Sequence, residues 1–179
     1  MRILGSMALM AELLAAATFV QKPARQPDMY FAGTPQPVVD AMLKLARVTA
    51  ADVVYDLGSG DGRIPITAAQ KYGAIGVGVE LQPRLIEIAK DNAVKAHVAD
   101  RVWFLNQDLF ETDLSPATVV ALYLLPQALA RLRPLLEGQL RPGARVVTHD
   151  FEISGWRESD SRKLPRGDGT SHTIHLYRR

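Results

Sequence analysis

The sequence contains no cysteine among its 179 residues. This absence excludes disulfide bonds, thiolate zinc sites and cysteine nucleophiles. An excess of one charge is also lacking, because 21 lysines and arginines nearly balance 19 aspartates and glutamates, for a formal net charge of +2. So small an excess does not by itself indicate a nucleic-acid partner, and the arginines near the C-terminus are interspersed with acidic residues. We therefore expect no nucleic-acid partner and interpret the C-terminal arginines as a solvated surface.

Repeats, low-complexity tracts and signs of a second domain are missing as well. A chain of this length, with 47% hydrophobic residues, is long enough for one globular domain with a substantial core. We assign that domain to residues 34–179. Residues 21–33 contain two prolines and a glycine, a composition typical of an extended linker. We expect the protein to be a cytoplasmic monomer and predict no metal site.

An apolar stretch covers residues 3–20, with Arg2 before it and Glu12 inside it. Three interpretations remain open: a signal peptide cleaved near the alanines at 15–17, a membrane anchor, and an amphipathic helix packed on the domain. Glu12 disfavours the first two, because a carboxylate in the middle of a membrane costs about 2.5 kcal/mol or more. We favour a helix that associates with a membrane or with the surface of the domain.

Short β-branched runs alternate with helical patterns through most of the chain. Strands are predicted at 53–56, 75–80, 102–105, 118–124 and 144–148, and helices at 35–47, 64–72, 85–96 and 126–136. Thr34 is expected to cap the first of these helices, and Pro134 to break or kink the last. The alternation predicts an α/β fold with a parallel sheet covered on both faces. Residues 162–164 and 173–177 predict an antiparallel hairpin at its edge.

A glycine-rich loop follows the first predicted strand, in the segment Asp56-Leu57-Gly58-Ser59-Gly60-Asp61-Gly62-Arg63. Glycines let the backbone approach a ligand closely, and the start of the following helix favours an anionic group such as a carboxylate. The alternative is a tight turn in an ordinary α/β domain. Arg63 stands where a dinucleotide-binding motif has its third glycine, and Asp56 and Asp61 would together repel a pyrophosphate. A ligand with an ammonium and a sulfonium fits better, which indicates S-adenosylmethionine rather than NAD.

The ends of the next two strands carry further candidates, because ligands of open α/β sheets bind beyond the carboxyl ends of the strands. Glu80 lies about 20 residues after the glycines, where an acid can accept hydrogen bonds from both ribose hydroxyls. The alternative for Glu80 is a solvated carboxylate. Asp108 can accept a hydrogen bond from the adenine amino group, with Leu109 and Phe110 as walls of the adenine site. The alternative for Asp108 is a turn cap.

The ends of the fourth and fifth strands are candidates for the chemistry. Tyr123 either lines the site or belongs to the core. Proline keeps the residue before it extended, so the carbonyls of Leu124 and Leu125 can point at a substrate amine. His149, next to Asp150, is either a base or a packed residue, and no serine or cysteine nucleophile motif accompanies it.

The motifs at 56–63, 80–83, 108–110 and 123–126 resemble those of the seven-strand S-adenosylmethionine-dependent methyltransferases. More narrowly, they are similar to the protein-lysine methyltransferase group that includes archaeal broad-specificity enzymes and the mitochondrial enzyme acting on the ATP synthase c subunit. The resemblance runs from about residue 34 to 156. It implies a Rossmann-like, doubly wound, mostly parallel seven-stranded sheet with a C-terminal antiparallel hairpin. It also implies methyl transfer from S-adenosylmethionine to a lysine amine of a protein substrate.

The resemblance implies a cofactor site and a methyl-transfer point lined by Tyr123. We assign to the cofactor site Asp56, Gly58, Gly60, Asp61, Gly62, Glu80, Asp108 and Leu109. Tyr30 is added because two aromatics, Tyr30 and Phe31, interrupt the linker and would fold over the cofactor as a lid. The alternative is that this pair seals the open end of the sheet.

Tyr123 and Asp150 are the candidate catalytic residues. The nucleophile must be a neutral amine, and a carboxylate beside it would stabilise the ammonium. We therefore expect the Tyr123 hydroxyl to orient the amine, and Asp150 to attract the lysine or order residues 150–156. The Asn-Pro-Pro-Tyr motif of enzymes that methylate nucleobases or glutamine is absent from this strand end. Alternatives are a small-molecule or nucleic-acid methyltransferase, a non-catalytic cofactor-binding module, and an NAD(P) enzyme.

Overall fold

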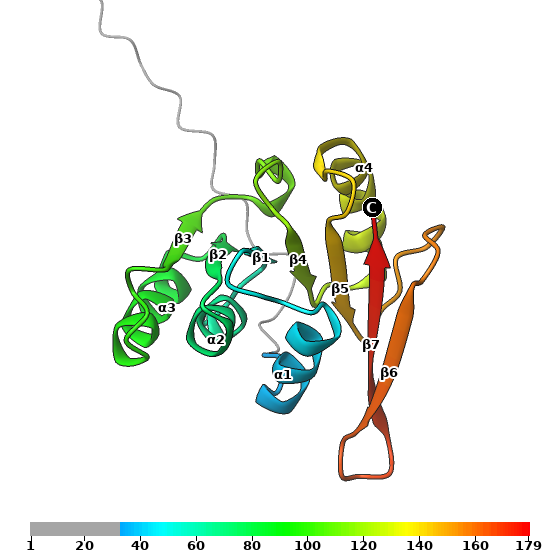
Figure 1. Ribbon diagram of the computed structural model, residues 1–179, viewed down its shortest axis with the longest axis horizontal. Coiled ribbons are helices and arrows are strands. Elements are labelled where there is room, and N and C mark those ends of the chain that lie inside the picture. Colours follow the sequence, from blue (N-terminus) through cyan, green and yellow to red (C-terminus); the bar gives the residue numbers. More distant parts are fainter. Residues whose placement is uncertain (1–32) are drawn as a thin grey trace, which may run out of the picture.

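The structure, a computed structural model, describes residues 33–179 (Figure 1). The apolar stretch at 3–20 and the Tyr30-Phe31 pair lie outside the described residues. The elements are α1 (Gln36–Leu45), β1 (Val53–Leu57), α2 (Arg63–Tyr72), β2 (Ile75–Glu80), α3 (Pro83–Lys95), β3 (Val102–Asn106), a short 3₁₀ helix (Leu109–Glu111), β4 (Val119–Leu122), α4 (Pro126–Gln139), β5 (Arg145–His149), β6 (Asp160–Pro165) and β7 (Ser171–Arg178).

The strands form one seven-stranded sheet in the order β3-β2-β1-β4-β5-β7-β6. Strands β1 to β5 pair in parallel, whereas β7 runs antiparallel to both β5 and β6. The predicted α/β fold with a C-terminal antiparallel hairpin is therefore confirmed. The order of the strands reverses between β1 and β4, and ligands of such sheets bind at the crevice beyond this switch point.

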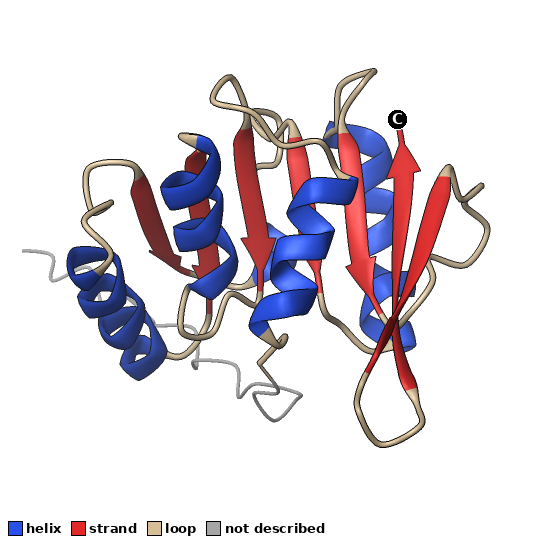
Figure 2. Cartoon of the chain, turned by 60° about the horizontal axis from the view of Figure 1, so that its bottom comes forward, coloured by secondary structure: helices blue, strands red, loops and turns tan. Residues whose placement is uncertain are grey.

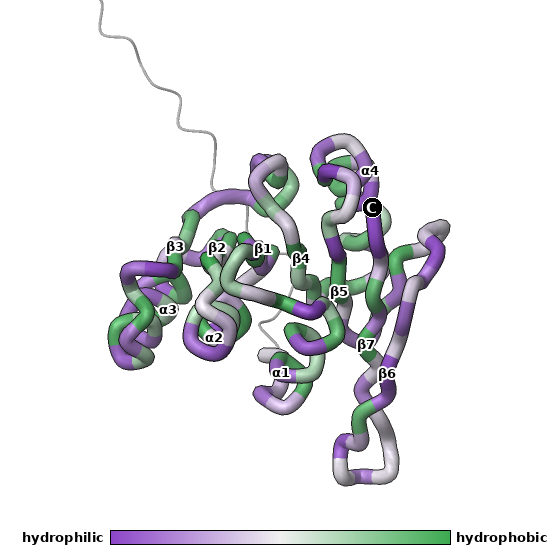
Figure 3. The backbone as a smooth tube through the Cα atoms, in the orientation of Figure 1, coloured by the Kyte–Doolittle hydropathy of each residue, from purple (hydrophilic) through white to green (hydrophobic). Residues whose placement is uncertain are grey.

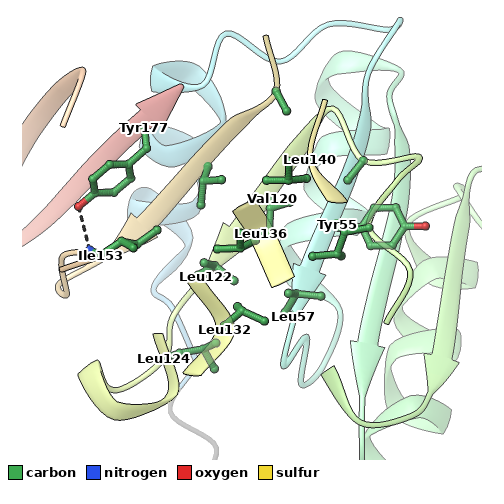
Figure 4. Close-up of a cluster of buried hydrophobic side chains, with 14 of the residues drawn as sticks. Tyr55, Leu57, Val120, Leu122, Leu124, Leu132, Leu136, Leu140, Ile153 and Tyr177 are labelled. Atoms are coloured by element: carbon green, nitrogen blue, oxygen red, sulfur yellow. Dashed lines mark hydrogen bonds between the residues drawn. The ribbon is translucent and has the colours of Figure 1, made fainter. Parts of the chain in front are cut away.

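Helices lie on both faces of the sheet (Figure 2). Helices α1, α2 and α3 cover one face, and α4 packs on the other. In Figure 4, Leu132 and Leu136 of α4 lie beside Leu57 of β1 and Leu122 of β4, all fully buried. The Tyr177 hydroxyl accepts a hydrogen bond from the Ile153 N–H at 3.0 Å. This core fixes the strand ends from which the candidate site is built.

The covering of the sheet is incomplete at its β3 edge. Trp103 and Leu105, on the side of β3 that points away from α3, are 51% and 36% exposed. The prediction of two covered faces therefore holds for the central strands but not for β3. The opposite edge of the sheet, at β6, is also more polar than the middle. Strand β4 is hydrophobic throughout, whereas β6 is mainly hydrophilic (Figure 3).

The structure differs from the prediction at the start of α1 and shows no break in α4. Thr34 does not cap α1, because the helix begins at Gln36 after Pro35 and has no side-chain cap. The Thr34 side chain is instead buried against His149. Pro134 does not break α4, which continues to Gln139. Pro134 and Ala130, whose carbonyl loses its partner, both lie on the solvent side, while Leu132 and Leu136 anchor the buried side. None of the helices described is long and apolar enough to span a membrane.

Candidate cofactor and methyl-transfer site

Asp56 lies near the carboxyl end of β1 with its side chain only 3% exposed. Burial is the main cause that raises the pKa of this carboxyl to about 8, and repulsion from Asp61 and Glu80 adds to it. No hydrogen bond from the described residues reaches the Asp56 carboxylate. A buried acid whose charged form is disfavoured in this way suits a cation, which would bring its pKa down again.

The loop after β1 keeps the backbone in the conformation that its glycines allow. Gly58, Gly60 and Gly62 all have positive φ angles, of 86°, 53° and 80°. The N–H groups of Gly58 and Ser59 both donate to the Val79 carbonyl of β2, at 2.8 and 2.9 Å. The loop is thus fixed to the neighbouring strand and leads directly into α2. A residue with a Cβ at any of these three glycine positions would be strained.

Arg63 connects this loop to the segment before α1. Its guanidinium pairs with Asp61 at 2.6 Å and also donates to the Thr34 carbonyl at 2.9 Å. Although burial works against ionisation, the bond from Arg63 lowers the pKa of Asp61. Asp61 is therefore a charged group with a directly bonded cationic partner, whereas Arg63 acts on Asp56 only through weaker Coulombic attraction.

Glu80 ends β2 and is 8% exposed. One of its carboxylate oxygens accepts from the Gly60 N–H at 3.1 Å and the other from the Gln82 N–H at 2.9 Å. The solvated alternative for Glu80 is thereby excluded. Each oxygen has a second lone pair, so the carboxylate can still accept from ribose hydroxyls.

Asp108 follows β3 and accepts a hydrogen bond from the Phe110 N–H at 3.0 Å. It therefore caps the short 3₁₀ helix that contains Leu109, in agreement with the alternative interpretation. A carboxylate has about four acceptor positions, so this cap is compatible with a further bond from an adenine amino group. Leu109 and Phe110 are both half-buried beside it.

A small cavity lies at the switch point between β1 and β4. Its walls include three predicted cofactor residues, Asp56, Gly58 and Asp61, together with the predicted catalytic Tyr123. Gly60, Gly62, Glu80 and Asp108 are not part of this wall and lie in the rest of the loop and at the neighbouring strand ends. The cavity is also lined by Gly33, Thr34, Ser59, Arg63 and Ile64.

The residues at this cavity suit S-adenosylmethionine. Asp56 is a buried acid whose pKa is raised mainly by burial, and the Ser59 Oγ is buried without a hydrogen-bond partner among the described residues. Such groups are costly unless a ligand engages them. Asp56 and the loop would hold the charged methionine part, and Glu80 the ribose. When bound, the cofactor supplies an electrophilic methyl group on a sulfonium centre.

His149, at the end of β5, packs its ring against the ring of Tyr123. The two ring centroids are 3.9 Å apart. His149 is 1% exposed, and burial is the main cause that lowers its pKa to about 4. A histidine with so low a pKa is a weak base, which accepts a proton poorly near neutral pH. The interpretation of His149 as a packed residue is therefore favoured.

Asp150 follows His149 with a φ of 62°, in the left-handed region. One carboxylate oxygen accepts from the Thr173 N–H at 3.0 Å and the other pairs with Arg166. Burial opposes ionisation, but these bonds lower the pKa of Asp150. His149, Asp150 and His172 have ligand atoms within 4.8 Å of one another, a grouping that could hold a metal ion. We interpret it as a hydrogen-bonded network, because Arg166 already places a cation on Asp150.

Sequence reasoning missed three residues at this site. It assigned Thr34 only to a helix cap, and it used Arg63 only as part of the motif at 56–63 and as an argument against a dinucleotide. His172 lies on β7, and its contact with His149 depends on the antiparallel register of β5 and β7. No spacing in the sequence gives that register. A useful signal for Arg63 was its position two residues after Asp61, at the end of the loop.

Comparison with known proteins agrees with this geometry. Residues 56–160 match the family described as the ANTKMT methyltransferase domain. The chain is 43% identical over 152 residues to a protein-lysine N-methyltransferase of Saccharolobus islandicus (strain REY15A), covering 84% of this chain and 94% of that protein. It is 34% identical over 145 residues to the adenine nucleotide translocase lysine N-methyltransferase of Mus musculus, covering 81% of this chain and 62% of the mouse protein.

A solved structure is also similar. An RNA methyltransferase from Salinibacter ruber, crystallised with S-adenosyl-L-homocysteine, is 50% identical in sequence. Its TM-score is 0.76, and the match covers 82% of this chain and 93% of that one. The similarity to the archaeal and Salinibacter proteins thus extends over almost their whole lengths, whereas the mouse protein is considerably longer than the matched part.

Proposed function

This chain belongs to the ANTKMT methyltransferase family, and on that premise we propose that it transfers methyl groups from S-adenosylmethionine to lysine side chains of a protein. The observation that carries the proposal is the position of Tyr123, which follows β4 and lines the same cavity as the buried Asp56. The site for the cofactor's charged end and a residue suited to orient an amine therefore meet at one point.

The end of β4 suits an amine substrate. Leu125 is extended, with φ −61° and ψ 154°, before α4 begins at Pro126. Backbone carbonyls there and the Tyr123 hydroxyl can accept hydrogen bonds from an amine without adding a full negative charge. This matters because free lysine has a pKa of about 10.4 and must lose a proton to react. A site that orients the amine without a neighbouring carboxylate does not favour the ammonium form.

Asp150 is poorly suited to be the base. Both of its carboxylate oxygens already have partners, Thr173 and Arg166, in the β6–β7 hairpin. Its contacts support a role in ordering the chain after β5. Catalysis then depends mainly on positioning the amine, a contribution that alone can be large.

The experiment that tests this proposal is transfer of a labelled methyl group from S-adenosylmethionine into a cell lysate. Half of the product is digested with protease and half with nuclease. We expect the label in protein, released by protease only. Label released by nuclease would instead support an RNA substrate, the activity named for the Salinibacter relative. A variant with Glu80→Ala, which should bind the cofactor poorly, is the matched control for transfer by this site.

A further inference from the structure

Tyr123 rests on a buried histidine. The ring of His149 lies 3.9 Å from the Tyr123 ring, centroid to centroid, with 33° between their planes. Phe151 stacks on Tyr123 at 6.4 Å and 18°. Tyr123 is half-buried, while His149 is buried completely. The orientation of Tyr123 at the cavity therefore depends on a ring that solvent cannot reach.

Both nitrogens of His149 have side-chain partners. Nδ1 lies 3.2 Å from the Thr34 hydroxyl, and Nε2 lies 2.7 Å from Nδ1 of His172 on β7. The charged groups facing the ring are Asp150, at 3.4 Å from Nε2, and Arg166, which pairs with Asp150. Burial lowers the pKa of His149, so the ring is neutral with one donor and one acceptor nitrogen. The two partners fix its orientation.

The same contacts extend to the cofactor loop. The Thr34 carbonyl accepts from Arg63, and Arg63 pairs with Asp61. A continuous series of hydrogen bonds, which passes through the Thr34 backbone, thus connects the glycine loop with His149 and the β6–β7 hairpin. His149 is the member of this series that contacts the Tyr123 ring.

We propose that His149 is a positioning residue for methyl transfer, which holds the Tyr123 ring at the cavity while Thr34 and His172 hold the imidazole. This inference rests on the proposed function. It assigns to His149 neither a proton transfer nor contact with the substrate. Loss of the ring should therefore lower the turnover rate of the enzyme but leave its affinity for S-adenosylhomocysteine unchanged.

Two substitutions separate the ring contact from the hydrogen bonds. His149→Leu removes the ring, whereas His149→Phe keeps an aromatic ring and removes both hydrogen bonds. We expect His149→Leu to lower kcat about tenfold, and His149→Phe to lower it distinctly less. His175→Phe is the matched control, because His175 is a second buried histidine, on β7, bonded to Glu158 rather than to the Tyr123 cluster. Its kcat should stay within twofold of the parent, and the melting temperature of every variant is measured first.

A double-mutant cycle tests whether His149 acts through Tyr123. In a Tyr123→Ala background, His149→Leu should lower kcat less than twofold further, because the ring it supports is already gone. A tenfold loss in that background, or equal losses for His149→Leu and His149→Phe, would overturn the proposal. So would an unchanged kcat in the folded His149→Leu variant.

Nuclear magnetic resonance gives a readout that does not depend on activity. With ¹⁵N-labelled histidine, His149 should be neutral at pH 7. Thr34→Val should shift the His149 and Tyr123 ring signals, whereas Thr34→Ser should restore both. A charged His149, or Tyr123 signals that ignore Thr34→Val, would contradict the proposal even if the His149 variants do not fold. A parent enzyme that methylates no protein would contradict the proposed function alone.

Discussion

The protonation of Asp56 depends on the cation beside it. Without one, burial holds its pKa at about 8. When the ammonium group of S-adenosylhomocysteine binds there, the carboxyl should lose its proton, because a nearby cation favours the charged form. Calorimetric titration at pH 7 in two buffers of different ionisation enthalpy should therefore detect proton release. Asp56→Asn should release none, and equal enthalpies for the parent in both buffers would refute the assignment.

The same group makes the stability of the ligand-free protein depend on pH between about 3.8 and 8. In the unfolded chain Asp56 loses its proton near its ordinary pKa of 3.8, but in the folded protein only near 8. Between these values the folded state binds more protons than the unfolded state. The contribution of Asp56 to the free energy of unfolding therefore falls as the pH rises through this range.

Glu80 combines two tasks, since it holds the loop and is predicted to hold the ribose. Glu80→Ala removes an acceptor whose hydrogen bonds from the ligand are each worth about 1.5–3 kcal/mol, so the affinity for S-adenosylhomocysteine should fall at least about tenfold. Glu80→Gln keeps an acceptor oxygen and should lose less. If Glu80→Ala binds as tightly as the parent, Glu80 serves only the N–H groups of Gly60 and Gln82.

The residues at the strand ends could be predicted because their position follows from the topology of a parallel sheet. Asp56, Glu80 and Tyr123 all follow or end strands at the expected edge, and Asp56 and Tyr123 line one cavity. The cluster of Thr34, His149 and His172 could not be predicted. It joins residues from three distant parts of the chain, and their contact depends on the register of an antiparallel pair.

The start of α2 depends on Gly62. Its φ is 80°, and a Cβ there would lie 2.6 Å from the Phe104 ring and 2.9 Å from Ala89. Gly62→Ala should thus combine backbone strain with overpacking and lower the free energy of unfolding by about 2–4 kcal/mol. Gly143→Ala is the control, because its φ is 88° but nothing lies within 4 Å. Thermal unfolding that destabilises both variants equally would show that the Phe104 contact is unimportant.

At the level of elements, the order of strands and helices was predictable and the ends of the helices were not. Alternating patterns located all the strands from β1 to β5 and the hairpin of β6 and β7. The behaviour of Pro134 depended on which side of α4 faces water. Which side of α4 is exposed depends on how the helix packs on the sheet, and it cannot be read from the helix propensities of the residues around the proline.

At the level of the molecule, the predicted lid concerns how much the residues before Gly33 contribute to cofactor affinity. If Tyr30 covers the cofactor, deletion of residues 1–20 should leave the affinity for S-adenosylhomocysteine unchanged, and deletion of residues 1–32 should abolish binding. Tyr30→Ala in the full chain controls for loss of the segment itself. Full affinity in the longer deletion would contradict the lid.

The central claim is that this domain places a lysine amine beside a bound methyl donor. The most direct measurement is tandem mass spectrometry of the protein that the enzyme labels with isotopically marked S-adenosylmethionine. The account predicts marked methyl groups on a lysine side chain, formed faster as the pH rises because more of the amine is neutral. Marked methyl groups on a nucleotide, or on another amino acid, would contradict it.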